Sequence, residues 1–133
     1  MATFHLQIVT PDRMVYDGEA EKIIVRTVGG DVCILARHID YAAPLGIGEA
    51  RVTDAEGKTR VAACAGGMLG VSAGEARVMA TTFEWADDID LERAKSAQAE
   101  AQKKLESLDR QDKDFAIMEA KLKRAIARIN VKG

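Results

Sequence analysis

The spacing of apolar residues changes near Trp85, and this change divides the chain into two segments. Before Trp85, apolar residues mostly alternate with polar ones or form short runs that end at turn residues, as Phe4, Leu6 and Ile8 do. This period of two is typical of half-buried strands. After Trp85, glycine is absent until Gly133, and apolar residues recur three and four positions apart, which is the period of a helix. The sequence therefore predicts an α+β chain in which strands precede helices.

Residues 1–85 form the predicted β domain, an antiparallel β-sandwich or flattened barrel. Many short strands separated by turn residues are typical of these architectures. We expect strands over 4–8, 14–16, 20–27, 32–35, 45–53, 59–65, 68–72 and 75–82. The turns between them are expected at Asp17-Gly18, Gly29-Gly30, Asp54 to Lys58, Gly66-Gly67 and Ala73-Gly74.

Residues 86–133 form the predicted helical domain, an antiparallel two-helix hairpin. Each helix carries one apolar stripe. The first stripe consists of Ala94, Ala97, Ala101, Leu105 and Leu108, and the second of Phe115, Met118, Leu122, Ile126 and Ile129. Asp87 and Asp88 suit the N-terminus of the first helix, where carboxylates accept free amide hydrogens. Each stripe must be buried against the other helix, the β domain or a partner.

Composition excludes several classes of protein. A formal net charge of −2 and a pI near 5.7 give no drive toward nucleic acid. No stretch approaches the ~20 apolar residues of a membrane span, and the first residues do not resemble a secretion signal. We therefore expect an intracellular protein, with Cys33 and Cys64 as buried free thiols. The few Cys and His residues predict no metal site.

No catalytic motif is present in the sequence. It contains neither a Gly-rich phosphate loop ending in Lys-Ser/Thr nor a Gly-x-Ser-x-Gly elbow. Cys33 and His38 are an imaginable nucleophile and base, but Cys33 lies in an apolar run where a thiol behaves as a small hydrophobe. The chain is therefore not expected to be an enzyme.

Two charged features remain open from spacing alone. Asp90 and Arg93 share a helix face, either as a capped helix start with an ion pair or as a site whose arginine binds phosphate. After Glu119 the chain carries five cations and no acid. These cations either complement the helix dipole or form a surface for an acidic partner, and they are Lys121, Lys123, Arg124, Arg128 and Lys132.

The chain resembles the epsilon subunit family of F-type ATP synthases, called delta in mitochondria. The resemblance extends over essentially the whole chain through motifs in a specific order. They are Phe4 to Pro11, Tyr16-Asp17-Gly18 with Glu21-Lys22-Ile23, Gly30-Asp31 leading to His38, Ala65 to Val71, Ile89 to Ala94, and Arg124 to Val131.

The resemblance implies a non-catalytic rotor subunit at the cytoplasmic face of a bacterial membrane, held there only through its complex. Its implied partners are the gamma subunit, the c-ring and the alpha/beta hexamer. Asp31 and His38 fall in the region implied to face the c-ring and gamma. The hairpin is implied to be regulatory: folded on the β domain it permits activity, and extended it blocks ATP hydrolysis. The cations Lys121, Lys123, Arg124 and Arg128 would then meet an acidic segment of a beta subunit.

The resemblance also implies a nucleotide site on the folded hairpin. Some bacterial members bind ATP through an Ile/Leu-Asp-x-x-Arg-Ala motif and arginines of the second helix. Ile89, Asp90, Arg93 and Ala94 match that motif, and Arg124 and Arg128 match the arginines. No cofactor is required, and ATP would act as a regulatory ligand. The alternatives are a free-standing nucleotide sensor that needs no partner and an adaptor that shows no nucleotide response.

Overall fold

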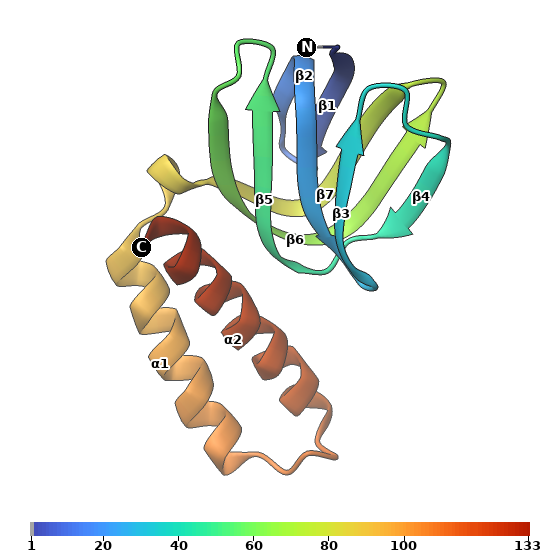
Figure 1. The fold of residues 1–133 in the computed structure, drawn as a ribbon. Helices are drawn as coiled ribbons and strands as arrows, with labels where there is room; N and C mark the ends of the chain where they lie inside the picture. The colour runs from blue at the N-terminus through green and yellow to red at the C-terminus, as the bar shows by residue number, and fades with distance from the viewer. Residues whose placement is uncertain (1) are drawn as a thin grey trace.

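The computed structural model describes residues 2–133, in which seven strands precede two long helices (Figure 1). The strands are β1 (Phe4–Thr10), β2 (Arg13–Thr27), β3 (Gly30–Leu35), β4 (Tyr41–Pro44), β5 (Ile47–Asp54), β6 (Thr59–Ser72) and β7 (Glu75–Trp85). A 3-10 turn, η1 (Ala86–Asp88), leads to α1 (Leu91–Ser107) and α2 (Lys113–Lys132). The predicted α+β class is thus confirmed.

Five of the strands close into a ring. The sheet order is β1-β7-β6-β5-β2, and β1 also pairs with β2, while β3 and β4 extend from β2 and β6. All pairs are antiparallel except β1 with β7, which is parallel. A ring with an odd number of strands cannot have every neighbouring pair antiparallel, so one parallel pair is a geometric necessity. The predicted flattened barrel is confirmed, with this parallel pair as an addition.

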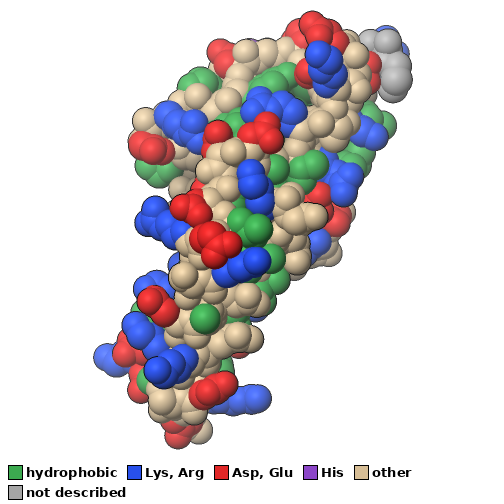
Figure 2. Space-filling view, turned by 90° about the vertical axis from the view of Figure 1, so that its left-hand side faces the viewer, with side chains coloured by type: hydrophobic (Ala, Val, Ile, Leu, Met, Phe, Trp, Pro, Cys, Tyr) green, Lys and Arg blue, Asp and Glu red, His purple; other side chains and the backbone are tan. Residues whose placement is uncertain are grey.

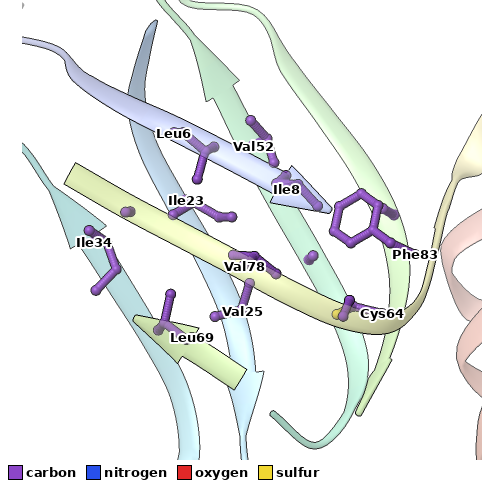
Figure 3. Packing of buried hydrophobic residues seen from close by; sticks show 14 of the residues in the cluster. Leu6, Ile8, Ile23, Val25, Ile34, Val52, Cys64, Leu69, Val78 and Phe83 are labelled. Atoms are coloured by element: carbon purple, nitrogen blue, oxygen red, sulfur yellow. The ribbon is translucent and has the colours of Figure 1, made fainter. Parts of the chain in front are cut away.

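The barrel contains its own hydrophobic core (Figure 3). Alternate residues of each strand point inward, as the period of two requires, and Leu6, Ile8, Ile23 and Val78 are fully buried. Phe83 closes one end of the core. Every member of this core cluster lies between residues 4 and 85. Because the core does not draw on the helices, we expect the barrel to fold without them.

Two predicted turns are wrong. Asp17-Gly18 lies inside the 15-residue strand β2, where Asp17 pairs with Gln7 and Gly18 with Leu6. Gly66-Gly67 lies inside β6, which pairs with β5 before the glycines and with β4 after them. Both glycines have positive φ, and a Cβ on Gly67 would lie 1.9 Å from the Met79 carbonyl oxygen. These glycines therefore bend a strand and let β7 approach, without ending the strand.

The exposed position of Cys33 is a second correction. Among the described strands, β3 pairs only with β2, and its residues alternate so that Ile34 is buried and Cys33 faces solvent. A short apolar run cannot tell which alternate residues face inward. Cys64 is buried, as predicted, and burial raises the pKa of its thiol to about 12.

The helices form the predicted antiparallel hairpin, and α2 lies against β5 and β6. Alanines occupy the tightest positions, since Ala94, Ala101 and Ala125 are buried. Asp87 and Asp88 belong to η1 and do not cap α1. The cap is Asp90, and Asp112 caps α2 in the same way.

Candidate functional site

A pocket of about 600 Å³ lies where the two helices meet the end of the barrel, a volume within the usual range of ligand sites. It begins at the end of β7 and at η1 and follows the facing sides of α1 and α2. Its lining residues are Glu84, Asp88, Asp90, Arg93, Ala94, Ala97, Glu100, Ala101, Lys104, Met118, Lys121, Arg124 and Arg128. The structure therefore brings Asp90, Arg93, Ala94, Arg124 and Arg128 to one cavity.

Asp90 and Arg93 are positioned by the start of α1. The Asp90 carboxylate oxygen Oδ1 accepts a hydrogen bond of 3.1 Å from the backbone N–H of Arg93, which satisfies one of the free amides of the helix N-terminus. Among residues 2–133 their two side chains form no ion pair. Of the two readings of Asp90 and Arg93, the capped helix start is present but has no ion pair between them, and both residues line the pocket.

Arg128 joins the hairpin to the barrel. Its Nε donates a 2.5 Å hydrogen bond to Oε1 of Glu84 on β7, and the two side chains are only 31% and 34% exposed. Partial burial strengthens such a charge-assisted bond relative to a surface ion pair. Within the described chain this is the one ion pair between a helix and a strand.

Four cations of the pocket are not engaged in ion pairs within residues 2–133: Arg93, Lys104, Lys121 and Arg124. Of the four carboxylates that line the pocket, Glu84 is neutralised by Arg128 and Asp90 is engaged in the helix cap, while Asp88 and Glu100 form no ion pair within residues 2–133. Unpaired guanidinium and ammonium groups facing a cavity are suited to binding phosphate. Figure 2 shows positive and negative side chains interspersed over the helical hairpin on the face that it presents.

The other predicted site residues lie outside the pocket. Ile89 is buried, with 4% exposure, and does not line the pocket. Lys123 lies 3.8 Å from Glu119 in an ion pair on α2. Of the cations predicted to meet a partner, Lys121, Arg124 and Arg128 line the pocket and Lys123 does not.

Asp31 and His38 lie on the barrel and are not brought together. Asp31 is the second residue of β3, where it accepts a 2.5 Å bond from Arg26 Nε. His38 follows the other end of β3, with Nδ1 2.7 Å from the Ile39 carbonyl oxygen and its ring edge against Tyr41. The two residues thus form no common site.

Helical periodicity could have revealed the pocket residues that the motif missed. Ala97, Glu100 and Lys104 follow Arg93 at steps of four, three and four, so they share its face of α1. By the same rule Lys121 shares the face of Arg124 and Arg128. Glu84 carries no comparable signal, because its role depends on where α2 meets the barrel.

A second charged cluster lies on the outer face of β1. His5 Nε2 is 2.5 Å from Asp17 Oδ1 and its Nδ1 is 3.6 Å from Glu75 Oε1. The hydrogen bond to Asp17, aided by Glu75, raises the pKa of His5 above its usual 6.5. All three side chains are at least 38% exposed, so the cluster stabilises strand pairing and forms no cavity.

In the described part of the chain, no group of three or more His, Cys, Asp or Glu residues could hold a metal ion. No helix over residues 2–133 is long and apolar enough to cross a membrane.

Comparison with known proteins matches both parts of the chain. Residues 3–86 match the family "ATP synthase, Delta/Epsilon chain, beta-sandwich domain", and residues 87–133 match "ATP synthase, Delta/Epsilon chain, long alpha-helix domain". The ATP synthase epsilon chain of Halalkalibacterium halodurans is 39% identical over 134 residues, covering 100% of this chain and 99% of the relative. That of Caldicellulosiruptor bescii is 36% identical, covering 98% and 94%.

The fold is similar to a chain in a solved structure of the Euglena gracilis mitochondrial ATP synthase, determined with OSCP, F1 and the c-ring. The TM-score is 0.82, with 22% identity, over 96% of this chain and 79% of that chain.

Proposed function

This chain belongs to the delta/epsilon chain family of ATP synthases, and from that premise we propose that it regulates a rotary enzyme through its helical hairpin. Within the central stalk of an F-type ATP synthase, the barrel would bind the gamma subunit and the c-ring and so couple ion flow to ATP synthesis. The complex would hold it peripherally at the cytoplasmic face of a bacterial membrane. The chain would contribute no catalytic residue of its own.

A movable hairpin is supported by how little joins it to the barrel. The barrel has a separate core, while the buried residues of α1 and α2 are small alanines. Small side chains bury little apolar area, and the docking free energy is correspondingly small. The ion pair between Arg128 and Glu84 is the main polar link. Such an element can exchange between two positions when each offers its own contacts.

In the second position, the hairpin would extend into the alpha/beta hexamer and block ATP hydrolysis. The cations of α2 would then meet an acidic surface of a beta subunit. Three of these cations, Lys121, Arg124 and Arg128, line the pocket when the hairpin is docked. Extension would therefore free them for the partner.

ATP would bind the docked hairpin. The observation that carries this proposal is the pocket itself, in which Arg93 of α1 meets Arg124 and Arg128 of α2 over a cavity of ligand size. A triphosphate held by both helices would stabilise the docked state, because a ligand favours the state that contains its site.

Calorimetric titration of ATP into the isolated protein tests the site. Arg93→Ala removes a charge-assisted contact and should weaken binding by about tenfold or more. Arg110→Ala is the matched control, since Arg110 lies in the exposed loop between the helices. Equal heats for all three proteins would remove the nucleotide site from the proposal.

Co-purification tests the partner assignment independently. An affinity-tagged form of the chain should recover the gamma subunit and the c-ring from solubilised membranes. ATP binding without any such partner would instead favour a free-standing nucleotide sensor. A chain that recovers partners but never responds to nucleotide would be an adaptor.

A further inference from the structure

One large apolar side chain is buried in the part of the chain that follows the barrel. Over residues 86–133 the buried hydrophobic residues are Ile89, Ala94, Ala101 and Ala125, so Ile89 is the one among them that is larger than alanine. Ile89 is only 4% exposed, yet it is not a member of the barrel core and does not line the pocket. Burial of an isoleucine removes far more apolar area from water than burial of an alanine. Ile89 therefore contributes a large share of the apolar area that the docked hairpin buries.

Ile89 lies at the junction between the barrel and the hairpin (Figure 1). Trp85, at the end of β7, belongs to the barrel core, and the Arg60 guanidinium carbon lies 3.8 Å from the centre of its ring. The turn η1 follows Trp85 and contacts both β6 and α2. A fully buried residue touches about six or more others, so the first turn of α1 alone cannot cover Ile89. Its burial therefore depends on the hairpin lying against the barrel.

Ile89 is attached to α1 more firmly than to the barrel. It directly precedes Asp90, the N-cap of α1, and Ile89 and Ala94 occupy the two positions of a hydrophobic staple, which fixes the angle at which a chain enters a helix. Both residues are buried, and the Asp90 carboxylate holds the backbone N–H of Arg93 in the same turn. A change in the direction of the chain would therefore occur within residues 86–88. Movement of α1 away from the barrel would carry Ile89 out of its buried place.

We propose that Ile89 is the apolar latch of the docked hairpin, a positioning residue that holds the start of α1 against the barrel and is released when the hairpin extends. This inference rests on the proposed movement of the hairpin and names a residue that determines how readily it occurs. The ion pair between Arg128 and Glu84 holds α2, and Ile89 holds α1. Because Ile89 does not line the pocket, it acts without touching a ligand, through the apolar area that extension returns to water.

Distances between two spin labels in the nucleotide-free full chain test the latch. One label is on Cys33 of β3 and the other on Gln111→Cys in the loop between the helices, and the ratio of short to long distances gives the docking equilibrium constant. Ile89→Val removes one buried carbon and should lower this constant about fourfold, and Ile89→Ala removes three and should lower it roughly 50-fold. Ile117→Ala is the matched control, because it removes the same three carbons from α2 at a residue that is 53% exposed. This control should leave the distance distribution unchanged.

The helix content of each variant, measured by circular dichroism, distinguishes a hairpin that has moved from one that has unfolded. If Ile89→Ala loses helix, Ile89→Val decides the question. If both Ile89 variants keep the wild-type distance distribution, or if Ile117→Ala shifts it as much as Ile89→Ala, Ile89 is not a latch and the inference fails.

Glu84→Gln tests the proposed movement separately, because it weakens the ion pair to Arg128 and leaves Ile89 intact. A shift with Glu84→Gln but with neither Ile89 variant would leave the hairpin movable and overturn the latch alone. If none of these variants shifts the distribution, the movable hairpin and the latch both fail.

Discussion

Glu84→Gln should release the hairpin from the barrel. The substitution keeps the size of the side chain but removes the carboxylate charge that accepts the 2.5 Å bond from Arg128. Both side chains are about two-thirds buried, so the loss lies between that of a surface pair and that of a buried one, at about 1–2 kcal/mol. The docking equilibrium constant should fall by a factor of about 5–30.

Distances between two spin labels measure this equilibrium. One label reacts with the exposed Cys33 on β3 and the other with a Gln111→Cys substitution in the loop between the helices, while the buried Cys64 stays unlabelled. Glu84→Gln should increase the population of longer distances.

The matched control is Asp31→Asn, which breaks an ion pair of the same 2.5 Å length between Arg26 and Asp31 on the surface of the barrel, away from the helices. This control should leave the distance distribution unchanged. If Glu84→Gln matches the wild type, or if both substitutions change the distribution equally, the ion pair does not hold the hairpin and the reasoning is refuted.

Three further predictions concern the barrel. In denaturant titrations, Gly67→Ala should reduce the free energy of unfolding by about 3 kcal/mol or more, because Gly67 has positive φ and the added Cβ would overlap the Met79 carbonyl oxygen. Gly70→Ala is the control: a Cβ there meets nothing within 4 Å, so the free energy of unfolding should change by less than about 1 kcal/mol. The raised pKa of His5 should stabilise the fold most below pH 6.5 and progressively less as the pH rises through the folded-state value; a His5→Gln variant that keeps the same pH slope would contradict this. Cys33 should react with a thiol reagent in the native protein and Cys64 only after unfolding. Equal reaction rates of the two thiols in the native protein would show that Cys64 is not buried.

Hydrophobic periodicity predicted the architecture because burial of one face decides it. The alternation of Leu6 and Ile8 with polar residues identified a strand whose inner face is fully buried, and the stripe containing Ala94 and Ala101 identified the buried face of α1. In both cases the local pattern and the tertiary structure impose the same requirement.

Positions governed by long-range pairing were not predictable. Gly18 reads as a turn residue, but pairing with Leu6 keeps β2 continuous, and Gly67 is required by the approach of the Met79 backbone. Cys33 is exposed because β3 has one paired side and one outward face. None of these contacts has a signal within its own stretch of sequence.

The residues of the candidate site could be predicted where they share one face of a helix, and could not be predicted where the two domains meet. Asp90 and Arg93 belong to a local motif, and Arg124 and Arg128 share a face at a spacing of four. Glu84 enters the pocket only because α2 lies against the barrel. Its pairing with Arg128 required the three-dimensional structure.

The ATP hydrolysis rate of the reconstituted enzyme tests the regulatory role of the hairpin most directly. Complexes would be assembled with the full chain or with residues 1–87 alone, a part that retains the entire barrel core, and the incorporation of each form would be checked. With equal incorporation, the complex that lacks the hairpin should hydrolyse ATP faster. Identical rates in the two complexes would contradict the proposal that the hairpin restrains hydrolysis.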